Sequence, residues 1–298
     1  MDGILPLWKP KGLTSHDCVV KVRKLLRTKK VGHTGTLDPE VEGVLPICIG
    51  EATKIVPFLT DTKKTYIAEV KLGAATDTED SHGKITNQTE ILNPPSLQII
   101  ENVLQSFRGQ ITQIPPMYSA VKVKGKKLYE YARANETVER PRRQITIHHL
   151  ELLAQTTNET DTFQVKVVCS KGTYIRTLCV DIGEALGYPA HMSNLIRLAT
   201  GSISKEDTVT FTEMDEAIEQ NLQEKLVLPI TRGIDHLDCL FVDEETKNKV
   251  LHGQKLKQPE IVPNTDPFAV MFDKQLLAIY QTHPEKPEQI KPVRVFNT

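Results

Sequence analysis

The segment VGHTGTLDPE, residues 31–40, places a single carboxylate, Asp38, in a stretch of small residues. The small residues are Gly32, Thr34, Gly35 and Thr36. One interpretation is an ordinary turn, because Asp followed by Pro often opens one. The other is a functional site, in which the glycines let a substrate approach the backbone while Pro39 holds Asp38 extended, with its carboxylate pointing outward. The segment alone leaves both interpretations open.

The composition is that of a globular protein. Of its 298 residues, 39% are apolar and 25% are charged, and this length predicts one large domain with a small one. No apolar run approaches the roughly 18 residues of a transmembrane helix. Asp2 and Pro6 stand where an export signal would need positive charge and an unbroken apolar run. Five cysteines without a C-x-x-C pair suit a reducing cytosol. We therefore expect a cytoplasmic protein. His148 and His149 lack nearby ligand side chains, so we expect no metal site.

The cationic residues gather in two patches although the formal net charge is −1. In residues 21–30 six of ten side chains are cationic, Lys21 and Lys24 among them. The second patch mixes lysines with tyrosines, whose rings could stack on unpaired bases. Its cations are Lys122, Lys124, Lys126, Lys127, Arg133, Arg140, Arg142 and Arg143, and its tyrosines are Tyr118, Tyr129 and Tyr131. Charge runs are usually solvated surface, yet phosphate binding needs only a local positive potential, so both interpretations stay open.

The N-terminal third predicts a helix and a half-buried strand. Ser15 is a good N-cap for a helix that runs to about Arg27 and carries the first basic patch on its surface. Strict alternation over residues 64–72 predicts a strand whose apolar face starts at Tyr66. Turn-forming residues dominate 73–84, which predicts a loop.

The middle of the chain predicts a helix, a long excursion and a second strand. Residues 96–107 have helical apolar spacing. The lysine-rich stretch up to about residue 143 lacks periodicity and predicts a long loop outside the core, of a kind that is usually functional or disordered. Alternation over 163–169 predicts a strand. If residues 173–176 are extended, Tyr174 and Arg176 share one face, before a helix that ends at Gly187.

The pattern changes near Arg232. Short strands then surround one helix at residues 243–252, which predicts a small barrel of about 60 residues. We expect the domain boundary near Ile234.

Together these pieces resemble the tRNA pseudouridine-55 synthase family of the TruB type. The resemblance rests on motifs in a fixed order: KPKGLTSHDCVVKVRK, VGHTGTLDPEVEGVLPICIGEATK, KTYIAEVKLGAATDTED, PPMYSAVKVKGKKLYEYAR, CSKGTYIRTLCVDIGEALG and HMSNLIRL. It implies an α+β fold in which helices flank a large, mostly antiparallel sheet, with a small PUA-like β-barrel at the C-terminus. The implied domains are a catalytic domain at 1–233, with an RNA-gripping insertion at about 118–146, and an RNA-binding domain at 234–298.

The resemblance also implies an activity, the isomerisation of the T-loop uridine U55 of tRNA to pseudouridine. The substrate would be the T-arm stem-loop, and the enzyme would act in the cytoplasm as a monomer, with no metal, cofactor, membrane or obligate protein partner. The family's essential aspartate falls on Asp38, its active-site tyrosine on Tyr66 and the arginine that pairs with the aspartate on Arg176. His33 would support the RNA loop as the base leaves it. The remaining expected RNA contacts are Lys21, Lys24, Lys122, Lys124, Lys126, Lys127 and Tyr174, the last as a pocket wall. Glu42 departs from the family pattern and adds negative charge beside the aspartate motif.

The chemistry explains why these residue types are needed. An ionised Asp38 could attack C1′ of the ribose or remove the C2′ proton, and the sequence does not separate these routes. Burial favours the protonated acid, so a fixed cation is required, and the fork of Arg176 can hold both carboxylate oxygens. Without the resemblance, Tyr66 would be a core aromatic and Arg176 a surface ion-pairing residue. Lys9 and Lys63 are expected to be solvated or phosphate-adjacent, outside the catalytic set.

Three rival functions remain at this stage. The chain could be a non-catalytic RNA-binding protein or tRNA chaperone, the catalytic subunit of a guide-RNA pseudouridylation particle, or a small-molecule hydrolase. If Asp38→Asn changed no measurable property, the non-catalytic RNA-binding function would be favoured. The second would call for basic extensions, and the third for a second carboxylate beside Asp38.

Overall fold

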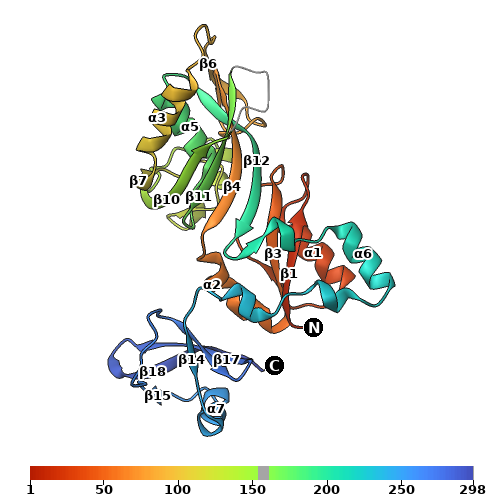
Figure 1. The fold of residues 1–298 in the computed structure, drawn as a ribbon. Coiled ribbons are helices and arrows are strands. Elements are labelled where there is room, and N and C mark those ends of the chain that lie inside the picture. The colour runs from red at the N-terminus through yellow and green to blue at the C-terminus, as the bar shows by residue number, and fades with distance from the viewer. Residues whose placement is uncertain (154–160, 298) are drawn as a thin grey trace. The chain divides into compact units, whose positions relative to one another are not determined.

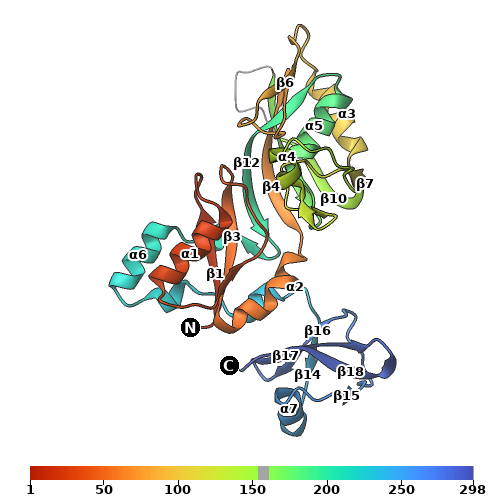
Figure 2. The ribbon, with the colours of Figure 1, turned by 180° about the vertical axis from the view of Figure 1, so that it is seen from behind.

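The computed structural model describes residues 1–153 and 161–297, in two compact units. The first unit comprises Met1–Thr62 and Thr200–Thr298, and the second comprises Lys63–Ala199. Both units combine helices with β-sheet (Figures 1 and 2). The predicted α+β class is therefore confirmed.

The N-terminal part of the first unit is built on strand β3 (Glu42–Ile49). It pairs antiparallel with β1 (Gly3–Lys9) and with β2 (Val31–His33). The other elements outside the C-terminal module are α1 (Ser15–Leu25), α2 (Val56–Thr60), β13 (Ile203–Ser204), α6 (Phe211–Glu219) and the 3-10 turns Gly50–Ile55, Lys205–Asp207, Gln223–Leu226 and Ile230–Gly233. Strand β3 carries the loop of interest, because residues 34–41 join it to β2.

The N-cap of helix α1 lies one residue earlier than expected. Thr14, not Ser15, is the N-cap, and it forms a capping box with Asp17: the Asp17 N–H donates to the Thr14 hydroxyl, and the Asp17 carboxylate accepts from the Thr14 N–H. Either residue of a Thr-Ser pair can cap a helix. The cap is favoured at the residue that has an acidic side chain three positions after it, which here is Thr14 with Asp17. The hydroxyl of Ser15 is left for another role.

The C-terminal module is a five-stranded sheet that covers one helix. The strand order is β14 (Cys239–Phe241), β16 (Phe268–Phe272), β17 (Gln275–His283), β18 (Lys286–Val295) and β15 (Leu256–Lys257). Helix α7 (Glu244–Leu251) is capped by Asp243 and packs Val250 against the sheet. The expected helix is present, and short strands precede and follow it as expected. The curled sheet is the one expected of a PUA-like module.

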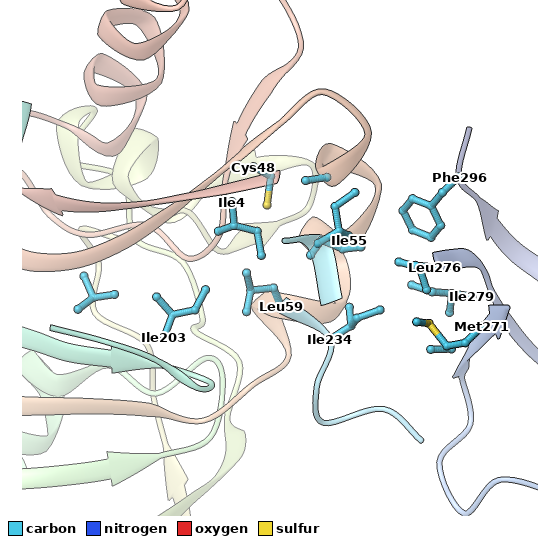
Figure 3. Packing of buried hydrophobic residues seen from close by; sticks show 14 residues of the cluster. Ile4, Cys48, Ile55, Leu59, Ile203, Ile234, Met271, Leu276, Ile279 and Phe296 are labelled. Atoms are coloured by element: carbon cyan, nitrogen blue, oxygen red, sulfur yellow. The ribbon is translucent and has the colours of Figure 1, made fainter. Parts of the chain in front are cut away.

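This module shares a hydrophobic core with the N-terminal part of the first unit (Figure 3). Ile4, Ile55 and Leu59 lie in the same cluster of buried side chains as Leu276 and Phe296. Contacts of this kind stabilise by removing apolar surface from water. Ile234 is also buried in this cluster. The expected domain boundary near Ile234 stays a prediction.

The second unit is a sheet with two helices on one face. Its strand order is β12 (Ala190–Thr200), β4 (Lys64–Leu72), β11 (Thr162–Cys169), β10 (Arg143–Leu152) and β7 (Gly109–Gln113). Strands β4, β11, β10 and β7 pair antiparallel. Helix α3 (Leu97–Ser106) packs on β10 and α5 (Ile175–Ala185) packs on β4 (Figure 2). The alternation predicted for β4 and β11 is confirmed by their burial.

Three expectations for the second unit were wrong. The loop predicted at 73–84 contains β5 (Ala74–Thr76), which pairs with β6 (Ile85–Gln88). The unpatterned lysine-rich stretch contains a hairpin of β8 (Lys122–Val123) and β9 (Lys126–Lys127) and the helix α4 (Leu128–Arg133). Residues 173–176 are not extended, because α5 already begins at Ile175. Pieces this short are stabilised by their tertiary contacts, so the periodicity of the sequence does not reveal them.

Within residues 1–153 and 161–297, none of the helices has both the length and the apolar character needed to cross a bilayer.

Candidate active site

A buried lysine holds the loop that carries Asp38. Lys9, the last residue of β1, has no exposed surface, and its Nζ donates to the carbonyl oxygens of Pro10 at 2.9 Å, Pro39 at 3.0 Å and Val41 at 2.6 Å. The expectation that Lys9 is solvated was therefore wrong. An ammonium can be buried where oxygen atoms accept its N–H groups. Because Pro39 and Val41 lie just after Asp38 in the chain, Lys9 ties the end of β1 to the aspartate loop.

The residue before Asp38 is held by Ser15. The Leu37 N–H donates to Ser15 Oγ at 2.9 Å, and the same hydroxyl donates to the Leu37 carbonyl at 3.2 Å. On the other side, the Val41 N–H donates to the Asp38 carbonyl at 3.1 Å, so the predicted turn is present. The half-buried Asp38 thus sits in a turn whose two flanks are tied to residues 9–15. The turn and the functional interpretation do not exclude one another.

Tyr66 lies on the buried face of β4, opposite Val167 of β11, with 9% of its surface exposed. Its neighbours on that face are Ala68 and Val70, as the alternation predicted. Burial of the ring agrees with a core aromatic and with a ring that lines a pocket, and its role toward a uridine stays a prediction.

Arg176 is buried in the first turn of α5 and bonds to two separate segments. Nη1 donates to the Thr78 carbonyl at 2.8 Å and Nη2 to the Tyr118 carbonyl at 3.0 Å. The Asp80 carboxylate lies 4.0 Å from Nη1. The two carbonyl bonds together fix the plane of the guanidinium, and such a planar fork is the property that distinguishes arginine from lysine. Neither Thr78 nor Asp80 was singled out by the sequence.

Acidic side chains lie close to this arginine. The Glu79 carboxylate accepts from the Thr177 hydroxyl at 2.6 Å, and the Glu79 backbone has a φ of +63°. Burial raises the pKa of Glu79 above its ordinary value, against the hydrogen bond from Thr177 and the charge of Arg176. Burial, with the charges of Glu184 and Glu79, raises the pKa of Asp181 to about 6. Two carboxyl groups with raised pKa values therefore lie near one another, Asp181 on α5 and Glu79 bonded to Thr177 in the first turn of that helix.

The first basic patch is an exposed helix surface. Lys21 and Lys24 are exposed on α1. The ammonium of Lys21 lies 4.1 Å from the ring centroid of Phe211 in α6, a cation–π contact. Both side chains can still approach a phosphate from solvent.

In the second basic patch the tyrosine rings already face cations. Lys126 lies 4.6 Å from the Tyr131 ring and also pairs with Glu136, while Lys127 and Arg133 lie over the ring of Tyr129 at 5.4 and 5.3 Å. A base that stacks on Tyr129 would share the ring with these cations. Lys122 and Lys124 are exposed, and Lys124 has a positive φ of +49°.

The two other expected RNA contacts lie at the ends of elements. His33 is the last residue of β2 and pairs with Ile47. Tyr174 is the N-cap residue of α5, with an extended backbone. The expectation that Tyr174 shares a strand face with Arg176 was wrong, because the helix starts between them. Tyr174 instead lies just before the first turn of α5, two residues before Arg176 in the chain.

The site residues are divided between the two units. Asp38 and His33 belong to the first unit, and Tyr66, Tyr174 and Arg176 to the second. Their convergence on one uridine stays a prediction. In the described part of the chain, no group of three or more His, Cys, Asp or Glu side chains could hold a metal ion.

Sequence reasoning missed the supporting contacts rather than the motifs. Lys9, Ser15 and Asp80 all lie in the quoted motifs, but the contacts that matter are distant in sequence. Ser15 bonds to a residue 22 positions away, Lys9 to residues 30 and 32 positions away, and Asp80 lies beside Arg176 of α5. The signal that could have found Ser15 is the adjacent Thr14–Asp17 capping box, which makes a second capping hydroxyl unnecessary.

Comparisons with known proteins agree with this architecture. Residues 23–175 match the model for the TruB family pseudouridylate synthase N-terminal domain, and residues 176–237 match that for the tRNA pseudouridylate synthase B C-terminal domain. A protein of Oceanobacillus iheyensis named tRNA pseudouridine synthase B is 60% identical over 297 residues, covering 99% of this chain and 98% of that protein. One of the same name from Bacillus licheniformis is 53% identical over 302 residues, covering 99% and 97%.

Solved structures share the fold. A Cbf5–Nop10–Gar1 complex matches with a TM-score of 0.76 at 29% identity, covering 99% of this chain and 83% of that chain. An H/ACA RNP bound to a substrate RNA containing 2′-deoxyuridine matches with a TM-score of 0.75 at 25% identity, covering 99% and 85%. The motifs, the fold and the full-length identity lead to one conclusion: the chain belongs to the TruB family of pseudouridylate synthases.

Proposed function

We propose that this chain isomerises uridine to pseudouridine in tRNA. The observation that carries the proposal is the 60% identity to a tRNA pseudouridine synthase B over 99% of this chain. The target is uridine 55 in the T-arm stem-loop, and the enzyme acts in the cytoplasm as a single chain without cofactor. Identity to the Cbf5 structure is only 29%, which favours a stand-alone enzyme over a particle subunit.

The reaction breaks the bond between N1 and C1′, joins C5 to C1′, releases the C5 proton and returns a proton to N1. The uridine must leave its stack before these atoms are accessible, at a cost of a few kcal/mol. Phosphate contacts from the exposed lysines of α1 and of the insertion, among them Lys21, Lys24, Lys122 and Lys124, can offset this cost. His33 takes the place of the departing base in the RNA loop.

Asp38 acts on the ribose of the flipped nucleotide, either at C1′ or at the C2′ proton. Arg176 keeps the carboxylate ionised and oriented by a charge-assisted, forked contact. The loop that carries Asp38 is held by Lys9 and Ser15, and the guanidinium of Arg176 is held by two carbonyls. Such preorganisation keeps a reacting group within a fraction of an ångström of its productive position.

Tyr66 contacts the base and moves the proton at C5. Its ring is rigidly placed on the buried face of β4, as a base platform requires. Tyr66→Phe separates the two roles: a purely stacking ring predicts nearly normal turnover, whereas proton transfer predicts severe loss with RNA binding retained.

The test is tritium release from tRNA transcripts labelled at uridine C5, for the wild type and Asp38→Asn, with tRNA binding measured in parallel. Release by the wild type alone, with binding by both proteins, is expected. Binding by both proteins without any release would overturn the proposal and leave a non-catalytic RNA-binding protein.

A further inference from the structure

The N-terminus of α5 has no side-chain cap of its own. Tyr174 is its N-cap residue, and a tyrosine side chain cannot accept from the N–H groups of the first turn; no such bond is formed here. The Tyr174 carbonyl accepts the first helical bond, from the Leu178 N–H at 3.0 Å. The Tyr174 N–H lies before the helix and needs a partner from elsewhere.

That partner is Gln113, the last residue of β7. Its Oε1 accepts from the Tyr174 N–H at 2.9 Å and its Nε2 donates to the Tyr174 carbonyl at 2.9 Å. Only 2% of the Gln113 surface is exposed. One amide therefore binds both polar groups of a residue 61 positions away. A primary amide has the donor and the acceptor that this arrangement requires, and a carboxylate or an apolar chain has not.

The segment that follows Gln113 touches the same helix a second time. Five residues on, the Tyr118 carbonyl accepts from Nη2 of Arg176. Between these contacts, the Pro115 carbonyl accepts from Nη1 of Arg140, at the far end of the lysine-rich insertion, at 3.0 Å. Residues 113–118 thus connect the base of the insertion to the helix start at one end and to the Arg176 guanidinium at the other.

We propose that Gln113 is a positioning residue for Arg176, which rests on the function proposed above. By fixing both polar groups of the N-cap peptide, Gln113 sets the direction in which the first turn of α5 leaves the sheet. Arg176 is the second residue of that helix, so an error at the cap is carried directly to the guanidinium. Gln113 touches neither the ribose nor the base in this account, and it acts through Arg176 alone.

The proposal predicts a specific kinetic pattern. Gln113→Leu removes both hydrogen bonds and should lower the single-turnover rate at saturating unmodified tRNA by at least about tenfold, with the Kd for the same tRNA changed by less than about threefold. Glutamate has the same shape as glutamine and keeps the acceptor for the Tyr174 N–H, but it loses the donor. The rate of Gln113→Glu should therefore lie between those of the wild type and Gln113→Leu. Gln110→Leu, an exposed glutamine on the same strand, is the matched control and should leave both quantities unchanged.

A double-mutant cycle separates positioning from a general loss of structure. In an Arg176→Lys background, Gln113→Leu should reduce the rate by less than about threefold further, because the group it positions is already absent. A fully multiplicative loss, or a wild-type rate in Gln113→Leu, would overturn the proposal. If Gln113→Leu does not fold, Gln113→Glu is read in its place by the same criteria.

Hydrogen exchange gives a readout that does not depend on activity. The amides at the start of α5 should exchange faster in Gln113→Leu than in the wild type and in Gln110→Leu. Unchanged exchange would show that the clamp does not hold the helix start, and would overturn the inference. Failure of the wild type to form pseudouridine would instead contradict the proposed function, so the two failures are distinguishable.

Discussion

The hydroxyl of Ser15 exchanges two hydrogen bonds with the backbone of Leu37, one from the N–H at 2.9 Å and one to the carbonyl at 3.2 Å. Leu37 directly precedes Asp38, and both Ser15 and Leu37 are buried. A side chain at the start of α1 therefore fixes the peptide that precedes Asp38. Thr14 leaves Ser15 available for this contact, because it caps the helix itself.

Ser15→Ala should slow catalysis more than it weakens RNA binding. The change leaves two buried backbone groups of Leu37 without this partner, which costs about 1–3 kcal/mol, and allows the Asp38 loop to shift. We expect the saturating single-turnover rate to fall by about tenfold or more. Ser202→Ala is the control, because Ser202 is exposed and its hydroxyl bonds to the Arg232 carbonyl. An unaltered rate in Ser15→Ala would contradict this role.

Lys9→Met should destabilise the fold. Methionine matches the length of lysine but removes the bonds to three carbonyls, of Pro10, Pro39 and Val41. We expect the free energy of unfolding to fall by about 2–4 kcal/mol, measured in urea. Lys63→Met is the comparison, since the sequence treats the two lysines alike but Lys63 is exposed, and it should change stability by less than about 0.5 kcal/mol. Equal effects would mean that burial of Lys9 contributes nothing.

Arg176→Lys should lower the saturating rate by at least about 100-fold, which is about 2.7 kcal/mol in the activation free energy. A lysine keeps the charge but cannot bond to the Thr78 and Tyr118 carbonyls while presenting a planar fork. Arg133→Ala is the contrast: Arg133 is exposed in the insertion, so its loss should weaken tRNA binding and leave the saturating rate nearly intact. Turnover by Arg176→Lys at the wild-type rate on saturating tRNA would remove the orienting role.

Asp181→Asn should stabilise the protein at neutral pH and not at acidic pH. Burial raises the pKa of Asp181 from 3.8 to about 6. A carboxyl whose pKa is raised by folding is neutral in both states well below pH 3.8. Between about pH 3.8 and 6 only the unfolded state ionises, so stability is lost across this range and the loss is complete above it. Asparagine imitates the neutral acid, so the variant should be more stable by about 1–2 kcal/mol at pH 8 and nearly equal at pH 3. Thermal unfolding across this range checks it, with the exposed Asp215→Asn as control; a constant difference at all pH values would contradict the assignment.

Phe296→Ala should destabilise the first unit as a whole. Phe296 is fully buried in the core that joins the C-terminal module to residues near Ile4 and Ile55 (Figure 3). Deletion of a buried aromatic side chain costs about 3–5 kcal/mol. Phe241, also in the module, is 67% exposed, and Phe241→Ala should cost less than about 0.5 kcal/mol. If Phe296→Ala lowered tRNA affinity without lowering stability, the module would act only as an RNA-binding surface.

The sequence predicted best where a local pattern and the tertiary environment agree. The strand that contains Tyr66 and the helix at Leu97–Ser106 follow directly from the spacing of their apolar residues. The short strands β5, β8 and β9 did not, because two or three residues carry no usable period. The start of α5 was misplaced for a related reason: Tyr174 gives no capping signal, and its cap is a glutamine from another strand.

The order and the residue sequences of the motifs were sufficient by themselves to indicate the family, the fold class and the residues that would carry the chemistry. The tertiary structure decided which neutral-looking residues support them. Lys9 is buried rather than solvated, Ser15 bonds a distant loop rather than its own helix, and Gln113 closes a helix start 61 residues away. The physical reason is that a local pattern specifies which face of an element is apolar. Which backbone groups still need a hydrogen-bond partner is determined only after the strands have paired and the chain has brought distant segments together.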